Sequence, residues 1–422
     1  MRRAFDYYAE SGDEQRAVEI AVYPIPPPLY VPSDYTAYLS LADRALAMVS
    51  PSSPEAGRLL STLGWFTGLR NYKSARSAFQ RSYRIAHRLG DNALEGRALA
   101  NDAAVDFWHL RWQGCLEKSL RAIEFAVEAD DYRTEMVARS FAMRMHATMG
   151  ESKEAAAHTV GMLEQAERFR ERYWLVTARV NPLWLAVLMG DWQAGRRLSE
   201  EVLALQSSDV RNLGSRALLE SQVGDFARAG TYADRLVKAR RLSARFPIEE
   251  AFAAGTLPLL ANITGADERL GQAQEAAEAA QSGGLVLPLI DLFVRVGQGF
   301  AAVLRRDVAQ AQEHHAALTP LKGTALVMLC ITVDRLLGLL AKTAGQVEDA
   351  LSHFEGGLTF CERAGYRPEY AWTAYDYAEA LLERGGPGDQ KRSEAMRIEA
   401  LAVARELGMQ PLIDRAGSPV SL

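Results

Sequence analysis

Histidines, cysteines and carboxylates most often carry out catalysis or bind metals, and this chain shows none of their usual patterns. Its seven histidines include no HExxH, the spacing that puts two metal ligands on one helix face. His314 and His315 are adjacent, so a helix would point them to different sides. Helix capping accounts for the acidic pairs Asp130–Asp131 and Glu249–Glu250. GxSxG, GxxxxGKS and GxxxxGKT are absent. We therefore expect no catalytic residue, cofactor or metal site, and no enzyme.

The three cysteines, Cys115, Cys330 and Cys361, are far apart in the sequence and odd in number. No CxxC spacing occurs, so neither a zinc site nor a disulfide framework is indicated. Cysteines of this kind are typical of buried thiols in a reducing compartment. The N-terminal residues lack the apolar core of a signal peptide. We therefore expect a cytoplasmic protein.

Aromatic side chains near arginines could form a binding surface instead, through stacking and cation–π contacts. Trp108 and Trp112 are four residues apart and would share one face of a helix. For this pair, filling the gap between neighbouring helices is the favoured explanation. A second aromatic group begins at Tyr366 and a third surrounds Trp174, and core packing explains part of each. The candidate residues of a groove for a partner or ligand are Trp108, Trp112, Trp174, Tyr366, Arg367, Tyr370 and Tyr375.

Size and composition limit the fold class. The chain has 422 residues, 48% of them hydrophobic, and a single core stops growing at about 250–300 residues. We therefore expect either several domains or an elongated repeat. The net charge is −5, and no basic stretch suggests direct binding of nucleic acid. The longest apolar stretches, Leu285–Ile290 and Ala325–Val333, are too short to span a membrane and are predicted to be buried helix segments.

A recurring turn is the strongest signal in the sequence. Each copy begins with a glycine or arginine and reaches a small or apolar residue about five positions later. After the longer first interval, successive copies are 34 to 43 residues apart, which indicates a repeat architecture. The first interval contains the proline-rich stretch Pro24–Pro32, which cannot continue a helix. The copies begin at Gly12, Arg70, Arg111, Gly150, Gly190, Gly224, Gly265, Arg306, Gly345 and Gly388.

Each interval has the apolar periodicity of two helices, with steps of three and four residues. Glycine suits the end of the first helix, because it adopts the left-handed conformation at little cost. We predict an all-α, right-handed solenoid of about nine or ten tetratricopeptide-like helix pairs, with negligible β-structure. An extra helix is expected at Asp34–Val49, and Pro182, Pro258 and Pro288 are expected in first turns or at kinks. The predicted domains are a helix pair with a proline-rich connection (1–33), a repeat domain (34–410) and a disordered tail (411–422).

The repeat resembles the tetratricopeptide repeat, but its period near 40 exceeds the usual 34 residues and is more similar to MalT-type regions. Four stretches resemble the C-terminal repeat region of bacterial LuxR-type and adenylate-cyclase-associated ATPase regulators: Tyr366–Thr373, Asp376–Glu383, Arg384–Asp389 and Ala400–Met409. The resemblance implies a scaffold that binds a protein or peptide in its concave groove. It also implies an upstream nucleotide-binding ATPase module as a partner.

The chain departs from these regulators because it lacks their catalytic and DNA-binding motifs. It has no phosphate loop, and too few residues follow the last predicted helix for a DNA-binding domain. Residues Arg3–Tyr8 resemble the interior of a helix, so we expect a truncated or split form of a longer regulator. The predicted function is a protein-interaction and regulatory sensor scaffold of a bacterial signalling or transcriptional regulator. The alternatives are a small-molecule effector sensor and a fragment of an ATPase or adenylate cyclase regulator, and the oligomeric state is open.

Overall fold

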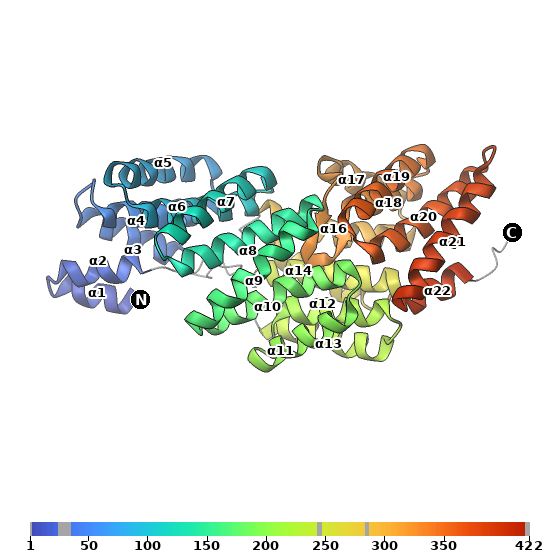
Figure 1. Ribbon diagram of the computed structural model, residues 1–422, viewed down its shortest axis with the longest axis horizontal. Helices are drawn as coiled ribbons and strands as arrows, with labels where there is room; N and C mark the ends of the chain where they lie inside the picture. Colours follow the sequence, from blue (N-terminus) through green and yellow to red (C-terminus); the bar gives the residue numbers. More distant parts are fainter. Residues whose placement is uncertain (1, 24–34, 243–246, 283–286, 418–422) are drawn as a thin grey trace. The chain divides into compact units, whose positions relative to one another are not determined.

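The computed structural model describes residues 2–23, 35–242, 247–282 and 287–417. These residues form 22 α-helices and two strands of two residues each, which confirms the predicted all-α class. Most of the helices are joined in pairs by short turns, as in a solenoid (Figure 1). The predicted connection at Pro24–Pro32 lies outside the described residues.

All ten predicted turns join the two helices of a pair, which confirms the repeat register. The expected extra helix is α3 (Tyr35–Ala47), and an unexpected one, α22 (Gln410–Gly417), follows the last pair. The pairs are α1 (Arg2–Glu10) with α2 (Glu14–Val22), α4 (Pro54–Gly68) with α5 (Tyr72–Leu89), α6 (Asn92–Trp108) with α7 (Trp112–Glu128), α8 (Tyr132–Met149) with α9 (Ser152–Phe169), α10 (Arg172–Met189) with α11 (Trp192–Leu205), α12 (Val210–Gln222) with α13 (Phe226–Leu242), α14 (Pro247–Thr264) with α15 (Leu270–Ser282), α16 (Pro288–Arg305) with α17 (Val308–Leu318), α18 (Val333–Thr343) with α19 (Val347–Ala364), and α20 (Arg367–Arg384) with α21 (Asp389–Leu407).

Backbone conformation explains why glycine recurs at the turns. In seven of the ten turns the first residue is a glycine with φ between 74° and 83°, a region that other residues avoid. Arg306 takes the same left-handed conformation, with φ of 54°. The residue that follows often caps the second helix, as where the Asp191 carboxylate accepts a hydrogen bond from the backbone N–H of Ala194 at 2.9 Å. Such a cap satisfies an amide donor that a helix start leaves free.

Small residues let neighbouring helices approach closely. Ala17, Ala75 and Ala155, at the same position of their turns, are fully buried. The approach is closest between α14 and α16, where a Cβ atom on Gly297 would lie 2.0 Å from the carbonyl oxygen of Ala254. No side chain fits into that space, so Gly297 sets the distance between these two helices.

Of the three prolines of the apolar stretches, Pro288 lies in a first turn as predicted. Pro182 and Pro258 are inside α10 and α14, and Pro288 is the first residue of α16. A proline inside a helix removes one backbone hydrogen bond, whereas a proline in the first turn removes none.

Ala325–Val333 is buried as predicted, but the prediction of a helix there is wrong. β1 (Ala325–Leu326) pairs antiparallel with β2 (Ile331–Thr332), with Ala325 opposite Thr332, and the 3-10 turn η2 (Val327–Leu329) lies between them. A second 3-10 turn, η1 (Thr319–Leu321), precedes this hairpin. Cys330 has a φ of 54°, which is incompatible with a continuous right-handed helix. The helix therefore begins only at Val333.

The prediction of a disordered tail from residue 411 is also wrong for the part that the structure describes. Residues 410–417 form α22, and Met409, Leu412 and Ala416 are buried. These three residues are three and four positions apart, the spacing of one helix face. Residues 418–422 lie outside the described residues.

The chain divides into two compact units. Unit 1 comprises Met1–Met145, Ala157–Trp174 and Gly284–Leu289, and unit 2 comprises His146–Ala156, Leu175–Gly283 and Ile290–Leu422. Phe5 and Ala17, from the first helix pair, share a hydrophobic core with Leu41 and Leu59. The boundary expected between residues 33 and 34 therefore does not separate the first pair from the helices that follow.

Among the described residues, no helix is both long enough and apolar enough to cross a membrane.

The close contact at Gly297 gives a first prediction. Gly297→Ala should lower the free energy of unfolding by about 2–3 kcal/mol, because the added methyl group forces α14 and α16 apart. Gly271→Ala in α15 is the matched control, since a Cβ there would meet no atom within 4 Å and alanine favours a helix. Urea denaturation followed by circular dichroism measures both, and equal midpoints for the two variants would contradict the role of Gly297.

Candidate functional site

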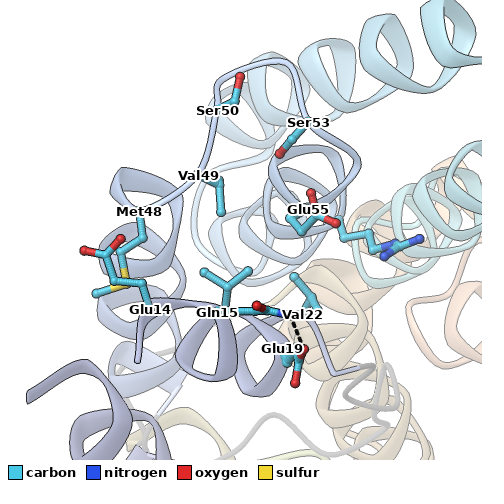
Figure 2. Close-up of a pocket in the computed structure, with 11 residues that line it drawn as sticks. Glu14, Gln15, Glu19, Val22, Met48, Val49, Ser50, Ser53 and Glu55 are labelled. Atoms are coloured by element: carbon cyan, nitrogen blue, oxygen red, sulfur yellow. Dashed lines mark hydrogen bonds between the residues drawn. The ribbon is translucent and has the colours of Figure 1, made fainter. Parts of the chain in front are cut away.

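A surface hollow in unit 1 is the candidate site. It lies between α2, the turn from α3 to α4, and the first turns of α4 (Figure 2). Its volume is about 450 Å³, within the range of ligand pockets in proteins. Part of its lining is apolar, from Val18 and Val22 of α2 and from Met48 and Val49 at the end of α3. The hollow therefore offers an apolar floor to a bound molecule.

Two helix starts position the acidic side chains of this hollow. α2 begins after Asp13, whose carboxylate accepts a hydrogen bond from the backbone N–H of Arg16 at 3.2 Å. α4 begins after Ser53, whose hydroxyl accepts one from the backbone N–H of Ala56 at 3.1 Å. Glu14 and Glu55 lie in the first turns of these helices, where the helix dipole favours a negative charge. Both glutamates line the hollow.

The charged side chains of the hollow have no opposite charge paired with them within the described part of the chain. Glu14 and Glu55 form neither a side-chain hydrogen bond nor an ion pair there, and the carboxylate of Glu19 accepts only a hydrogen bond from Gln15 at 3.3 Å (Figure 2). Arg58, which also lines the hollow, forms no ion pair with any of them. Three carboxylates and one guanidinium leave a net charge of −2 on the lining.

Three of the seven predicted groove residues lie in the protein interior. Trp108 and Trp174 are 1% and 2% exposed, and Tyr366 is fully buried. The Tyr366 hydroxyl donates a hydrogen bond to the carbonyl oxygen of Ala147 at 2.6 Å. These side chains fill gaps between helices and offer no surface to a partner.

The other four predicted residues are partly exposed and are divided between the two units. Trp112, in unit 1, packs against Phe107 with ring centroids 6.0 Å apart. The other three belong to α20 in unit 2. Arg367 pairs with Glu406, and the Tyr370 hydroxyl donates a hydrogen bond to Glu399 at 2.8 Å; burial and this bond raise the pKa of Tyr370 to about 12. Tyr375 is half-buried, and burial raises its pKa.

A buried polar cluster of unit 2 surrounds Arg335, which is 2% exposed. Its guanidinium donates hydrogen bonds to Glu369 at 3.0 Å and to Asp376 at 2.8 Å. Glu369 is 2% exposed, and burial raises its pKa although Arg335 opposes this shift. Glu369 also accepts the backbone N–H of Thr332 at 2.9 Å. The buried carboxylate is thus held between a helix and the hairpin.

Trp372 links this cluster to other helices of unit 2. The guanidinium groups of Arg335 and Arg415 lie over its ring, at 5.2 and 5.1 Å from the ring centroid. Its indole N–H donates a hydrogen bond to Gln222 of α12 at 2.8 Å. Arg415 of α22 in turn donates to the carbonyl oxygens of Asn262 and Ile263 near the end of α14, at 2.7 and 2.9 Å.

The C-terminal part of unit 2 packs along the turns of four earlier helix pairs. At the first turn, Arg363 donates a hydrogen bond to the carbonyl oxygen of Met149. At the second, Trp192 donates one to the carbonyl oxygen of Leu407. At the third and fourth, Gln410 packs on Gly224 and Arg415 lies beside Gly265. This surface of unit 2 is therefore occupied by the chain itself.

Unit 1 contains a buried charge cluster of its own. Asp102 and Asp106 lie one turn apart on α6 and are almost fully buried. Lys118 pairs with both of them, and Arg76 pairs with Asp102. The Tyr72 hydroxyl donates a hydrogen bond to Asp106 at 2.8 Å. These carboxylates are satisfied within the protein, unlike those of the hollow.

The structure pairs His315 with His353 of α19, and not with its neighbour His314. The Nε2 atoms of His315 and His353 are 3.1 Å apart. Burial and the neighbouring His353 lower the pKa of His315. In the described ranges, no group of three or more histidine, cysteine, aspartate or glutamate side chains is placed to hold a metal ion.

All three cysteines are buried and unpaired, as predicted. Burial is the largest cause that raises the pKa of each thiol. Buried thiols with a raised pKa are poor nucleophiles.

Sequence reasoning missed the hollow, because nothing local marks its residues. Glu14 and Glu55 have the appearance of ordinary acidic residues in first turns, and they are 41 positions apart in the sequence. Their common position depends on how α2 packs beside α4. The unpaired state of Glu19 and Arg58 likewise depends on tertiary structure.

The Arg335 cluster gives a second prediction. Arg335→Ala should lower the free energy of unfolding of unit 2 by about 3–5 kcal/mol, because it leaves the Glu369 carboxylate buried without its partner. Arg367→Ala, at the first residue of α20, is the control, since the pair of Arg367 with Glu406 is exposed and such pairs contribute little. Urea titrations of both variants measure the difference. Similar losses for the two would show that burial of the Arg335 pair has no special importance.

His314 gives a third prediction, on pH dependence. It is 2% exposed, neither ring nitrogen has a hydrogen-bond partner among the described residues, and burial lowers its pKa. Below about pH 6.5 the unfolded chain binds a proton there that the folded chain excludes, so stability falls as the pH falls. His314→Leu should reduce the drop in melting temperature between about pH 7.5 and about pH 5.5, and exposed His87→Gln should not. A drop that His314→Leu leaves unchanged would contradict this assignment.

No protein-family model and no curated protein matches the chain. A Rap protein in complex with competence and sporulation factor is similar in structure, at 12% identity and a TM-score of 0.49, over 86% of this chain and 96% of that one. The Cut9–Hcn1 hetero-tetramer of the APC/C has 12% sequence identity and a TM-score of 0.27, over 91% of this chain and 93% of that one. A circular tandem repeat protein has 14% sequence identity and a TM-score of 0.19, over 99% of this chain and 90% of that one. With TM-scores below 0.5, these three likenesses support no conclusion about this chain.

Proposed function

We propose that the protein is an interaction scaffold that binds a segment of a partner protein in the hollow of unit 1. The observation that carries this proposal is the combination of an apolar floor with unpaired charges at one surface hollow. An apolar floor gains free energy when a partner covers it, and unpaired charges at a rim select the partner. Nothing in the arrangement requires catalysis.

The regulatory setting of this scaffold rests on the sequence resemblance. We propose a cytoplasmic role in a bacterial signalling or transcriptional regulator, with a nucleotide-binding ATPase module as one partner. The four C-terminal stretches between Tyr366 and Met409 support this setting, and the net charge of −5 favours a protein partner over nucleic acid. Trp112, Arg367, Tyr370 and Tyr375 are proposed as secondary contacts, because they are partly exposed.

A small-molecule sensor is the second candidate function. The volume of about 450 Å³ favours it, because drug-sized ligands occupy hollows of this size. The two functions differ in what occupies the hollow in the cell, a polypeptide or a small effector.

Site-specific photo-crosslinking tests the scaffold function. A photoreactive phenylalanine analogue is placed at Ser50, which lines the hollow, or at the exposed Glu394 of α21 as a control. We expect the full-length chain in its source cell to form a crosslinked protein species from position 50 and not from position 394. Val49→Trp, which fills the hollow, should abolish that species while circular dichroism shows an unchanged fold.

Two results would count against the scaffold. Equal crosslinking from both positions would mean that the hollow has no special affinity for proteins. Absence of crosslinks from position 50, together with a small molecule that co-purifies with the protein and is lost in Val49→Trp, would favour the sensor.

A further inference from the structure

The floor of the hollow sets the first requirement for its occupant. Val18 of α2 is 7% exposed, and Val22, Met48 and Val49 are half-buried around it. These four side chains offer no hydrogen-bond donor or acceptor beyond the weak thioether of methionine. The part of the ligand that covers them must therefore be apolar.

Glu14, Glu19 and Glu55 set the second requirement. Two other acidic residues near these helices pair with a cation, since Asp6 pairs with Arg44 at 2.6 Å and Asp13 lies 3.6 Å from Arg16. Glu10, the last residue of α1, forms no ion pair among the described residues. The three glutamates of the hollow have no such cation within the described part of the chain. Three carboxylates without a paired cation thus line one hollow.

Helix dipoles account for the position of two of these glutamates but not for their convergence. A negative charge in the first turn stabilises a helix by about 0.3–1 kcal/mol wherever that turn is located. Glu154, in the first turn of α9, meets this need at an exposed position that does not line the hollow. Glu14 and Glu55 come from different helices, and with Glu19 they surround one apolar floor (Figure 2).

We infer that the occupant of the hollow is a cationic amphipathic peptide segment. An apolar side chain of this segment covers Val18 and its neighbours, and lysine or arginine side chains face Glu14, Glu19 and Glu55. The single guanidinium, Arg58, is available to a backbone carbonyl or an acidic residue of the same segment and sets its direction. This inference rests on the proposed function and specifies the chemistry of the partner.

Fluorescence anisotropy with three short labelled peptides tests the inference on the full-length chain. The peptides share alternating leucines and carry lysine, glutamine or glutamate at every other position. The lysine peptide should bind best, the glutamine peptide about tenfold or more weakly, and the glutamate peptide not measurably. Added salt should weaken the lysine peptide most, because rim charges are screened.

Charge-matched variants locate the binding. The triple variant Glu14→Gln, Glu19→Gln, Glu55→Gln should weaken the lysine peptide about tenfold or more, since each exposed pair contributes a factor of about 1.5 to 5. The control is Glu124→Gln, Glu154→Gln, Glu394→Gln, which removes the same three charges at exposed positions away from the hollow. It should leave the affinity within about twofold. Circular dichroism melting verifies that both variants fold.

The peptide-binding results test the cationic-peptide inference, and the crosslinking results test the scaffold function. Equal weakening by both triple variants, equal affinity for lysine and glutamine peptides, or no peptide binding at all overturns the inference. The proposed function would then stand or fall with the crosslinks from position 50. Conversely, tight binding of the lysine peptide without any crosslink in the cell supports the chemistry of the hollow and counts against the scaffold.

Discussion

Paired helices in this chain bury their apolar faces only where small residues let the two backbones come close. Ala17, Ala75 and Ala155 do this within pairs, and Gly297 does it between pairs, against the carbonyl oxygen of Ala254. At Gly338, a Cβ atom would meet the ring of Phe354 at 2.5 Å, so the absence of a side chain makes room for an aromatic one. A single helix pair on its own gains little free energy of folding, because most of its apolar face stays exposed. When pairs stack, neighbouring pairs share a hydrophobic core.

Local chemistry made the repeat predictable from the sequence. A glycine that ends a helix and an aspartate that begins the next act over a few residues, so all ten turns and the extra helix at α3 could be placed in advance. The hairpin at Ala325–Thr332 and helix α22 could not, because their apolar residues are buried by distant parts of unit 2. The same limit applies to sites. Trp108 and Tyr366 were candidate groove residues and lie in the core, as the favoured explanation of the Trp108 pair already held, while Glu14 and Glu55 were not candidates.

The carboxylates described above are of two kinds, buried with partners and exposed without them. Asp102, Asp106 and Glu369 are buried, and cations or hydrogen-bond donors satisfy each of them. Removing such a partner is costly, so these clusters hold particular helices in register. The glutamates of the hollow are exposed or partly exposed, which leaves them available to a partner. Contacts of this second kind can form and dissociate without unfolding either unit.

The packing of the C-terminal helices of unit 2 on earlier turns also constrains how the chain reaches its native state. Tyr366 bonds to Ala147 across 219 positions of sequence, and Leu407 accepts a bond from Trp192 across 215. A ribosome makes these partners many seconds apart, at about 5–20 residues per second. During that time the early turns of unit 2 present carbonyl oxygens and apolar surface to the solvent. A repeat protein with only nearest-neighbour contacts could fold from one end. In unit 2, by contrast, the packing of the early turns is complete only after α22 has been synthesised.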